Sequence, residues 1–373
     1  MMLVDGHQDL AWNILTFNRD YTRSAAVTRQ LEAGSLAQQH NGDTLLGWKD
    51  YQHGKVGLVF ATLFVTPQRY CMGEWDRLCY ADHEQAHALY SAQIDAYERL
   101  VEENPDKYRL VLSQKDLDEI IKAWQAFIRS TESPSENKTL QEEGPAVGLV
   151  MLMEGAEGVR EPSELEWWWK RGVRIIGPAW AGTRFCGGTK EPGPLTKEGY
   201  ALFEGMADFG FALDLSHMDE KAALQALDTY PGQIIASHSN AFTPLKVPVD
   251  SNRHLADRTI QGLVERNAVI GIVLYNSFLK AGWQKGDRRS EVKLDQVVAQ
   301  IDHVCQIAGN AQHVGIGSDF DGGFGVQSVP EGIDTIADLQ KLIPLLQEKG
   351  YSDIHIEAIL GKNWIAKLMQ ILE

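Results

Sequence analysis

The sequence lacks long apolar runs, an excess of basic residues and a large number of cysteines. No apolar stretch approaches the roughly 20 residues of a membrane-spanning helix, so we expect no membrane contact. Lys and Arg number 35 against 51 Asp and Glu, which gives a formal net charge of −16. Nucleic-acid binding requires a basic face, so this acidic chain is a poor candidate for it. Asp5 and His7 interrupt the N-terminus, so no secretory signal is expected.

Cysteine is scarce, with four residues in a chain of 373. This number is too small for a disulfide scaffold, and the spacing of Cys71 and Cys79 matches no specific motif. The simplest interpretation is a reduced protein in the cytoplasm. The chain shows no internal repeat, no linker and no change in composition, so we expect residues 1–373 to form a single domain.

Short apolar runs alternate with longer amphipathic stretches. Eight runs are rich in Val, Ile, Leu and Phe: Leu3–Leu10, Gly57–Val65, Ala146–Met153, Val173–Gly177, Phe211–Leu215, Gln233–Ser237, Ala268–Tyr275 and Val314–Ser318. Such near-continuous hydrophobicity is typical of parallel strands buried on both faces. Helices are expected between them, most clearly at 82–100 and 294–308, and at the C-terminus at 335–347 and 354–372. The alternation predicts an α/β fold, a (β/α)8 TIM-like barrel with C-terminal helices.

A doubly wound open sheet is the alternative fold, but no Gly-x-Gly-x-x-Gly motif opens a helix after the first strand. Three connections, at 12–55, 114–144 and 276–293, are long, and residues 130–139 are typical of a surface loop. Long loops often form the rim of a barrel active site. A bare barrel needs about 250 residues, so we expect the extra residues in these loops to decide the substrate.

Polar residues at the ends of the predicted strands carry the chemical information. In a barrel, the carboxyl ends of the strands face the active site. The first strand ends with His7 and Asp9, which are two residues apart and therefore share one face. The fifth and sixth strands end with His217 and His238. The third ends with Glu154, a carboxylate that is costly to bury unless it is paired or binds a metal.

Together these five side chains predict a metal site, although an isolated His-x-Asp pair is more often a simple hydrogen-bonded pair. Imidazole and carboxylate ligands suit Zn²⁺, with Mn²⁺, Fe²⁺ and Co²⁺ as alternatives. Five ligands are too many for one open catalytic zinc but enough for two metal ions with a bridging carboxylate. Such a pair can activate water and polarise a carbonyl. The eighth strand adds Asp319, a spare carboxylate that could move a proton, and Asp321, which we expect to be structural.

A second metal motif competes with this interpretation. His83 and His87 belong to a His-Glu-x-x-His sequence, typical of zincin proteases, in which Glu84 could act as a base. The stretch is polar on most sides, would lie in the outer ring of the barrel and has no obvious third ligand. A solvated helix is therefore favoured over a second zinc site.

The motifs resemble those of the membrane (renal) dipeptidase family of the amidohydrolase superfamily, from residue 3 to about residue 325. They are Asp-Gly-His-Gln-Asp (5–9), Glu-Gly-Ala (154–156), Gly-Val-Arg (172–174), Asp-Leu-Ser-His (214–217), Ser-His-Ser (237–239), Asn-Arg-His-Leu-Ala-Asp (252–257) and Gly-Ser-Asp-Phe-Asp-Gly (317–322). The resemblance implies that His7 and Asp9 bind one zinc ion, that His217 and His238 bind the other, and that Glu154 bridges them.

The resemblance also implies roles around the metals. Asp319 corresponds to the family's proton shuttle. Arg253 corresponds to the arginine that binds the C-terminal carboxylate of a dipeptide, a task that suits a guanidinium because it can donate two parallel hydrogen bonds. Tyr275 ends the seventh strand, where the family places substrate contacts. A homodimer is a further implication of the resemblance.

One position departs from the family. Trp180 stands where family dipeptidases carry the His of Leu-Thr-His, which helps to hold the reacting carbonyl oxygen. Indole has a single donor and cannot become a cation, and loss of one such donor can cost on the order of 10²–10³ in rate. Trp180 could instead stack on an aromatic or cationic substrate group, or a loop shift could bring Arg184 or His254 to the site.

The sequence therefore favours a metal-dependent dipeptidase with two divalent ions, Zn²⁺ first, acting on a small dipeptide-like substrate. The first alternative is an amidohydrolase for an N-acyl amino acid, a cyclic amide or a lactone, which the tryptophan at position 180 favours. A zincin-type protease is weaker. A non-catalytic metal-binding or ligand-binding protein is also weaker, because a pure binder does not need an acid such as Asp319 outside the metal ligands.

Overall fold

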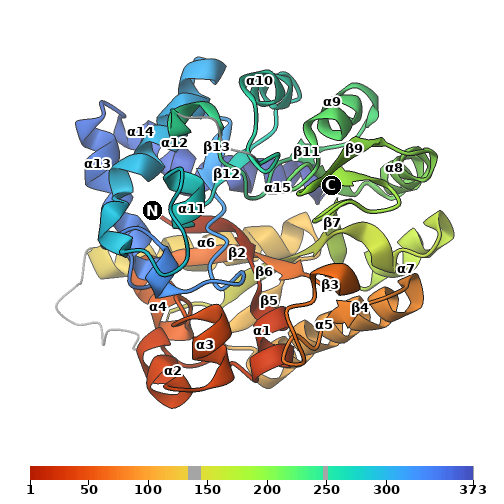
Figure 1. Ribbon diagram of the computed structural model, residues 1–373. Coiled ribbons are helices and arrows are strands. Elements are labelled where there is room, and N and C mark those ends of the chain that lie inside the picture. The colour runs from red at the N-terminus through yellow and green to blue at the C-terminus, as the bar shows by residue number, and fades with distance from the viewer. Residues whose placement is uncertain (133–143, 247–250, 373) are drawn as a thin grey trace.

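The computed structural model describes residues 1–132, 144–246 and 251–372. Its centre is a sheet of eight parallel strands: β1 (Leu3–Gln8), β2 (Val56–Leu63), β6 (Val147–Glu154), β7 (Val173–Gly177), β10 (Ala212–Asp214), β11 (Ile234–Ile235), β12 (Ile270–Ile272) and β13 (Val314–Ile316). The order across the sheet is β11-β10-β7-β6-β2-β1-β13-β12. Barrel strands that follow one another along the chain are therefore hydrogen-bonded neighbours, and the first strand, β1, pairs with the last, β13. Figure 1 shows the helices arranged around these strands.

The two ends of this sheet meet, which nearly closes the barrel. Ala236, directly after β11, forms a parallel bridge with Ile270 of β12. The Ala236 N–H donates to the Val269 carbonyl at 3.0 Å, and the Gly271 N–H donates to the Ala236 carbonyl at 2.8 Å. The predicted (β/α)8 barrel is therefore confirmed, and the open-sheet alternative is wrong.

Burial explains why the strands could be recognised. Every residue of β2 and β6 is buried, as expected for strands packed between the barrel interior and the outer helices. The closing strands are only two or three residues long, yet their residues are buried too. Gly317, just beyond β13, has no room for a side chain, because a Cβ there would lie 1.9 Å from the Ser237 carbonyl oxygen. This close approach draws the segments after β11 and β13 together at the carboxyl end of the barrel.

Helices occupy the connections and the C-terminus. The longer ones are α5 (His83–Glu103), α6 (Gln114–Glu132), α8 (Lys197–Phe209), α9 (Glu220–Thr229), α10 (Asp257–Glu265), α12 (Leu294–Ala308) and α15 (Asn363–Ile371). The shorter ones are α7 (Leu165–Lys170), α11 (Asn276–Leu279), α13 (Leu342–Glu348) and α14 (Asp353–Glu357). The helix predicted at 294–308 matches α12, and that at 354–372 is divided between α14, a π-helical turn at 358–362 and α15.

The first long connection contains helices that the sequence did not indicate. Residues 12–55 contain most of α1 (Leu10–Phe17) and all of α2 (Ala25–Glu32), α3 (Leu36–Asn41) and α4 (Trp48–Gly54). Part of the surface loop expected at 130–139 is the end of α6, which continues to residue 132; the remainder lies outside the described residues. Small strand pairs complete the rim: β3 (Thr66–Pro67) with β4 (Cys79–Tyr80), and β8 (Cys186–Gly188) with β9 (Glu191–Leu195); β5 (Tyr108–Leu110) adds to β6.

Asp321 holds the first long connection to the barrel. Its buried carboxylate accepts hydrogen bonds from Arg19 at 3.1 Å, from the Tyr21 hydroxyl at 2.9 Å and from the Leu45 N–H at 3.0 Å. These donors use both carboxylate oxygens, which gives this side chain a structural role. Within the described residues, no helix has the length and apolar character that a bilayer crossing requires.

Candidate metal centre and active site

The structure brings the five predicted metal ligands together at the carboxyl ends of the barrel strands. His7 lies at the end of β1, and its Nε2 faces three carboxylates. It is 3.6 Å from Asp9 Oδ2, 3.7 Å from Glu154 Oε2 and 3.8 Å from Asp319 Oδ1. Neither ring nitrogen of His7 has a hydrogen-bond partner, and Asp9 Oδ1 also lacks one. Buried polar atoms are normally satisfied, so these atoms are suited to hold a cation.

His217 and His238 approach the other oxygen of the same glutamate. Glu154 Oε1 lies 3.0 Å from His217 Nε2 and 3.5 Å from His238 Nε2, and the two imidazole nitrogens are 3.0 Å apart. Glu154 therefore reaches histidines on both sides with its two oxygens. His217 is held in place by a left-handed backbone conformation, with φ of 67°, directly after the fifth barrel strand.

Hydrogen bonds behind the histidines fix which nitrogen faces the cluster. The Ser237 hydroxyl donates to Asp214, so His238 Nδ1, at 2.8 Å from the same hydroxyl oxygen, must be the donor in that contact. His238 Nε2 then carries the lone pair. Thr189 Oγ1 lies 2.9 Å from His217 Nδ1 and supports that ring from behind. Such support is usual for histidines that bind metals, because it fixes the orientation of the ring.

Burial and neighbouring charges have opposite effects on the pKa values in the cluster. Burial raises the pKa of Glu154 to about 8 and that of Asp319 to about 7. For His7 burial acts to lower the pKa, but the carboxylates of Glu154, Asp9 and Asp319 outweigh it and raise the value to about 10. Several carboxylates crowded into a buried site repel one another, and a divalent cation among them would relieve that repulsion.

Burial favours the neutral form of the other two histidines. Burial lowers the pKa of both His217 and His238 well below 6.5, with nearby positive side chains adding to the effect. The Nε2 atoms of both rings and one Glu154 oxygen converge over distances of 3.0 to 3.5 Å. Nitrogen and oxygen atoms gathered in this way form a donor set that a divalent cation binds. The donor atoms therefore fit a divalent metal on this side of Glu154 as well.

A cavity of about 1060 Å³ opens above this cluster. Its walls are largely aromatic, and its floor includes Asp9, Glu154, His217 and Asp319. Among the lining residues are all three predicted substrate-binding residues: Arg253, Trp180 and Tyr275. This size and this mixture of apolar walls with a few polar groups are typical of a small-molecule site.

Arg253 is fixed in the cavity wall beside His238. Its Nη1 donates to Ser239 Oγ at 3.1 Å, and its Nη2 donates to the His238 carbonyl at 2.6 Å. The side chain is buried, and its Nε has no partner. A buried donor without a partner is costly, so the guanidinium retains the capacity to bind an acceptor on a ligand.

Trp180 lies in an aromatic group beside His217. Its ring centroid is 5.2 Å from that of Phe64, 5.8 Å from that of Tyr70 and 6.2 Å from that of His217. Tyr275 lies elsewhere in the wall and stacks on Phe324 at 4.5 Å. Both rings therefore offer apolar surface to a ligand.

Neither suggested substitute for the missing histidine lines this cavity. Arg184 is directed away and contacts Glu157 and Glu198 at 3.3 and 3.0 Å. His254 packs edge-on against Phe278, outside the cavity lining, and burial lowers its pKa to about 4.

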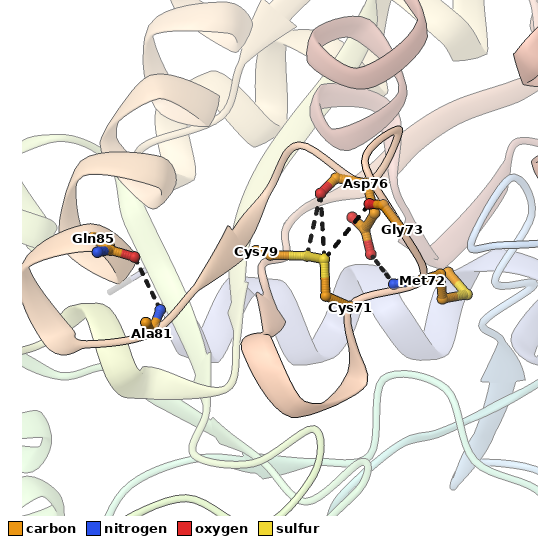
Figure 2. Close-up of a disulfide and its surroundings, with 7 residues drawn as sticks. All are labelled: Cys71, Met72, Gly73, Asp76, Cys79, Ala81 and Gln85. Carbon is orange, nitrogen blue, oxygen red and sulfur yellow. Dashed lines mark hydrogen bonds between the residues drawn. A yellow bond between two sulfur atoms is a disulfide. The ribbon is translucent and has the colours of Figure 1, made fainter.

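A disulfide lies at the rim of the cavity, contrary to the reduced state favoured by the sequence. Figure 2 shows Cys71 joined to Cys79, with the Met72 N–H donating to Asp76 at 3.3 Å inside the closed loop. Met72 is exposed and lines the cavity. The bond therefore restrains a segment that faces the ligand space. The cytoplasmic location stays a prediction.

The His-Glu-x-x-His motif begins helix α5 on the outside of the barrel. His83 is exposed and its Nδ1 lies 2.9 Å from Glu157, whereas His87 Nδ1 lies 3.0 Å from the Gly158 carbonyl. Glu84 pairs with Arg160. The two histidines thus have separate partners, and the groups of potential metal ligands found in the described residues do not include them.

The barrel thus gathers histidines and carboxylates at the carboxyl ends of its strands, on the floor of one cavity. Comparison with known families identifies the family. The model of the membrane dipeptidase family (peptidase family M19) matches residues 1–373, so the chain belongs to this family of metallopeptidases.

Individual relatives agree with this assignment. An uncharacterized protein in the pqqA 5′ region of Klebsiella pneumoniae is 29% identical over 289 residues, which cover 75% of this chain and 94% of that protein. Dipeptidase tcpJ of Claviceps purpurea is 25% identical, with 85% of this chain and 67% of that protein covered.

Solved structures agree in fold. A metallopeptidase from Rhodobacter sphaeroides has a TM-score of 0.76 at 22% identity, with 100% of this chain and 99% of that chain covered. The probable dipeptidase PvdM from Pseudomonas aeruginosa has a TM-score of 0.75 at 17% identity, with 100% and 96% covered.

Proposed function

We propose that the protein hydrolyses the peptide bond of dipeptides and uses two divalent metal ions, Zn²⁺ in the first place. The observation that carries this proposal is the combination of five converging ligand side chains on the cavity floor with a buried, partly unpartnered arginine in the wall. The first group provides the chemistry of amide hydrolysis. The second limits the substrate to a short molecule with a carboxylate near its scissile bond.

The side chains divide naturally into two metal sites. His7 and Asp9 would hold one ion and His217 and His238 the other, with Glu154 shared between them. When bound, the ions would polarise the scissile carbonyl and lower the pKa of an attacking water. Zinc suits this set of imidazole and carboxylate donors.

Asp319 would move the proton. Its carboxylate is 3.8 Å from His7 Nε2 and lines the cavity, so it lies beside the ligands and still faces a substrate. In this position it can accept a proton from the attacking water and return it to the departing amine. Its left-handed backbone, with φ of 61°, fixes the direction in which the side chain leaves the barrel strand.

Known relatives support a dipeptide substrate. The Rhodobacter sphaeroides metallopeptidase was crystallised with a phosphinate mimic of the dipeptide L-Ala-D-Ala. The Claviceps purpurea relative is named a dipeptidase. Applied to this chain, a dipeptide would extend from the metal cluster to Arg253, with its side chains against the aromatic walls.

Replacing Arg253 by Ala should raise KM roughly 10- to 100-fold for dipeptides with a free C-terminal carboxylate, because a charge-assisted hydrogen bond is lost. The matched measurement uses dipeptide methyl esters, whose KM should change far less. Equal losses on acids and esters would remove Arg253 from carboxylate binding. Metal content is measured in parallel, because the guanidinium also contacts the His238 carbonyl.

A second candidate function rests on Trp180. The ring adds an apolar surface near His217 and supplies no cationic donor for a carbonyl oxygen. An N-acyl amino acid, a cyclic amide or a lactone would use the same metals and could place its apolar part on this ring. A panel of dipeptides against N-acyl amino acids separates the two functions. Higher kcat/KM for the dipeptides supports the first proposal, and the reverse order supports the second.

A further inference from the structure

The basic side chain of Lys190 lines the cavity but has no role in the proposed function. The cavity is lined by three carboxylates, all of which belong to the metal cluster, and by the basic side chains of Arg253 and Lys190. Arg253 is assigned to the C-terminal carboxylate of the substrate. Lys190 lies at the turn between β8 and β9 and is exposed to the cavity.

The turn that carries Lys190 is held firmly in place. The Thr189 N–H donates to the Trp180 carbonyl at 3.0 Å, and the Lys190 N–H donates to Asn252 Oδ1 at 3.0 Å. Asn252 Nδ2 in turn donates to the Gly188 carbonyl at 2.9 Å. The turn is thus hydrogen-bonded both to Asn252, the residue before Arg253, and to the backbone of Trp180 in the cavity wall. Lys190 therefore has a fixed backbone, and its side chain begins from a defined position.

The ammonium group of Lys190 has no carboxylate partner among the described residues. It lies 5.4 Å from the centroid of the Tyr70 ring. The neighbouring Glu191 does not neutralise it, because the Glu191 carboxylate accepts from Arg69 Nε at 2.7 Å and Nη2 at 2.6 Å. The Tyr70 hydroxyl also donates to Glu191, at 3.1 Å. The Arg69–Glu191 pair is thus satisfied by itself, and the positive charge of Lys190 remains available to the cavity.

We infer that Lys190 binds a second carboxylate of the substrate, so that dipeptides with an acidic side chain are the preferred substrates. The inference rests on the proposed dipeptidase function and deepens it. The C-terminal carboxylate is assigned to Arg253, so a carboxylate that pairs with Lys190 must belong to the side chain of an Asp or Glu residue. Complementary charge at a site of this kind contributes to the choice between substrates.

Matched acid and amide dipeptides test this directly, because Asp and Asn have nearly the same shape. The metal-loaded enzyme is assayed with Ala-Asp against Ala-Asn and with Asp-Ala against Asn-Ala; the two pairs distinguish the residue that carries the acid. In one of the two pairs we expect kcat/KM to be roughly tenfold higher for the acid than for the amide. This factor lies between the small effect of an exposed ion pair and the larger effect of a buried hydrogen bond to a charged group. The difference should lie mainly in KM.

Variants of Lys190 then assign the preference. Lys190→Met should make the acid and amide substrates equivalent, Lys190→Arg should keep the preference, and Lys190→Glu should reverse it. A merely structural role would not produce a reversal. Lys197→Met removes an exposed lysine of the neighbouring helix α8, outside the cavity lining, and should leave the preference as it is.

Two results would overturn the inference. The first is a wild-type enzyme that hydrolyses neutral dipeptides but does not distinguish acid from amide in either pair. The second is a Lys190→Met variant that keeps the full acid preference. A metal-loaded enzyme that hydrolyses none of the dipeptides contradicts the proposed function itself, and the inference then falls with it.

Discussion

Replacing Glu154 by Gln should remove most of the bound metal and reduce turnover by about 10³-fold or more. This loss exceeds the roughly 10- to 100-fold loss that is typical when a residue hydrogen-bonded to a metal ligand is replaced. The reason is geometric. One oxygen of Glu154 lies 3.7 Å from His7, and the other lies 3.0 Å from His217. A neutral amide of the same shape cannot bridge two cations with two negatively charged oxygens. The measurement is metal content per chain together with kcat.

Glu157→Gln is the matched control for this variant. Glu157 is also buried and follows three residues later, but its carboxylate contacts Arg184 and His83 rather than the metal cluster. This variant should keep its metal ions even if its thermal stability falls. Retention of both ions and most of the activity by Glu154→Gln would contradict the bridging role.

Replacing Asp319 by Asn should leave both metal ions bound and lower kcat by about 10²–10⁴-fold, the range for loss of a general acid–base group. The amide cannot accept the proton of the attacking water. Asp319 is at the edge of the cluster and faces the cavity, so its loss need not disturb the histidines. Metal content and single-turnover rates separate chemistry from metal binding. A fully active variant would refute the proton-transfer role, and a variant that loses metal would make Asp319 a ligand.

Asp321→Asn distinguishes the two acids of the Asp-Phe-Asp-Gly sequence. Asp321 is fully buried and is bound by Arg19, Tyr21 and a backbone N–H of the first long connection. Loss of its charge should lower the unfolding temperature, because the buried Arg19 loses one of its two carboxylate partners and keeps only Glu32. Most of the turnover should remain, in contrast to Asp319→Asn.

The barrel could be predicted because its strands are buried on both faces. Runs such as those of β2 and β6 are apolar at nearly every position, which leaves a strong signal in the sequence. The first polar residues after such runs, His7 and Glu154 among them, had to meet at the carboxyl ends of the strands. The fold, and the meeting of the predicted ligands at one end of the barrel, were therefore accessible from local patterns.

Other features depend on contacts between distant segments, which local patterns do not contain. Thr189 supports His217 across a separation of 28 residues, from a hairpin without a recognisable motif. Lys190 follows it and could not be placed in the cavity. The Cys71–Cys79 disulfide required the loop between them to fold back, and the cysteine count indicated a reduced protein instead. The sequence motif Asn-Arg-His did contain Asn252, but only the structure shows that it holds the hairpin.

The central claim is that one shared cluster binds two metal ions that are required for amide hydrolysis. Its most direct test is a zinc titration of chelator-treated protein, with bound metal and dipeptide hydrolysis measured on the same samples. We predict that activity is lost with the metal and returns fully at two equivalents of Zn²⁺ per chain. Full activity without metal, or saturation of both binding and activity at one equivalent, would contradict this account.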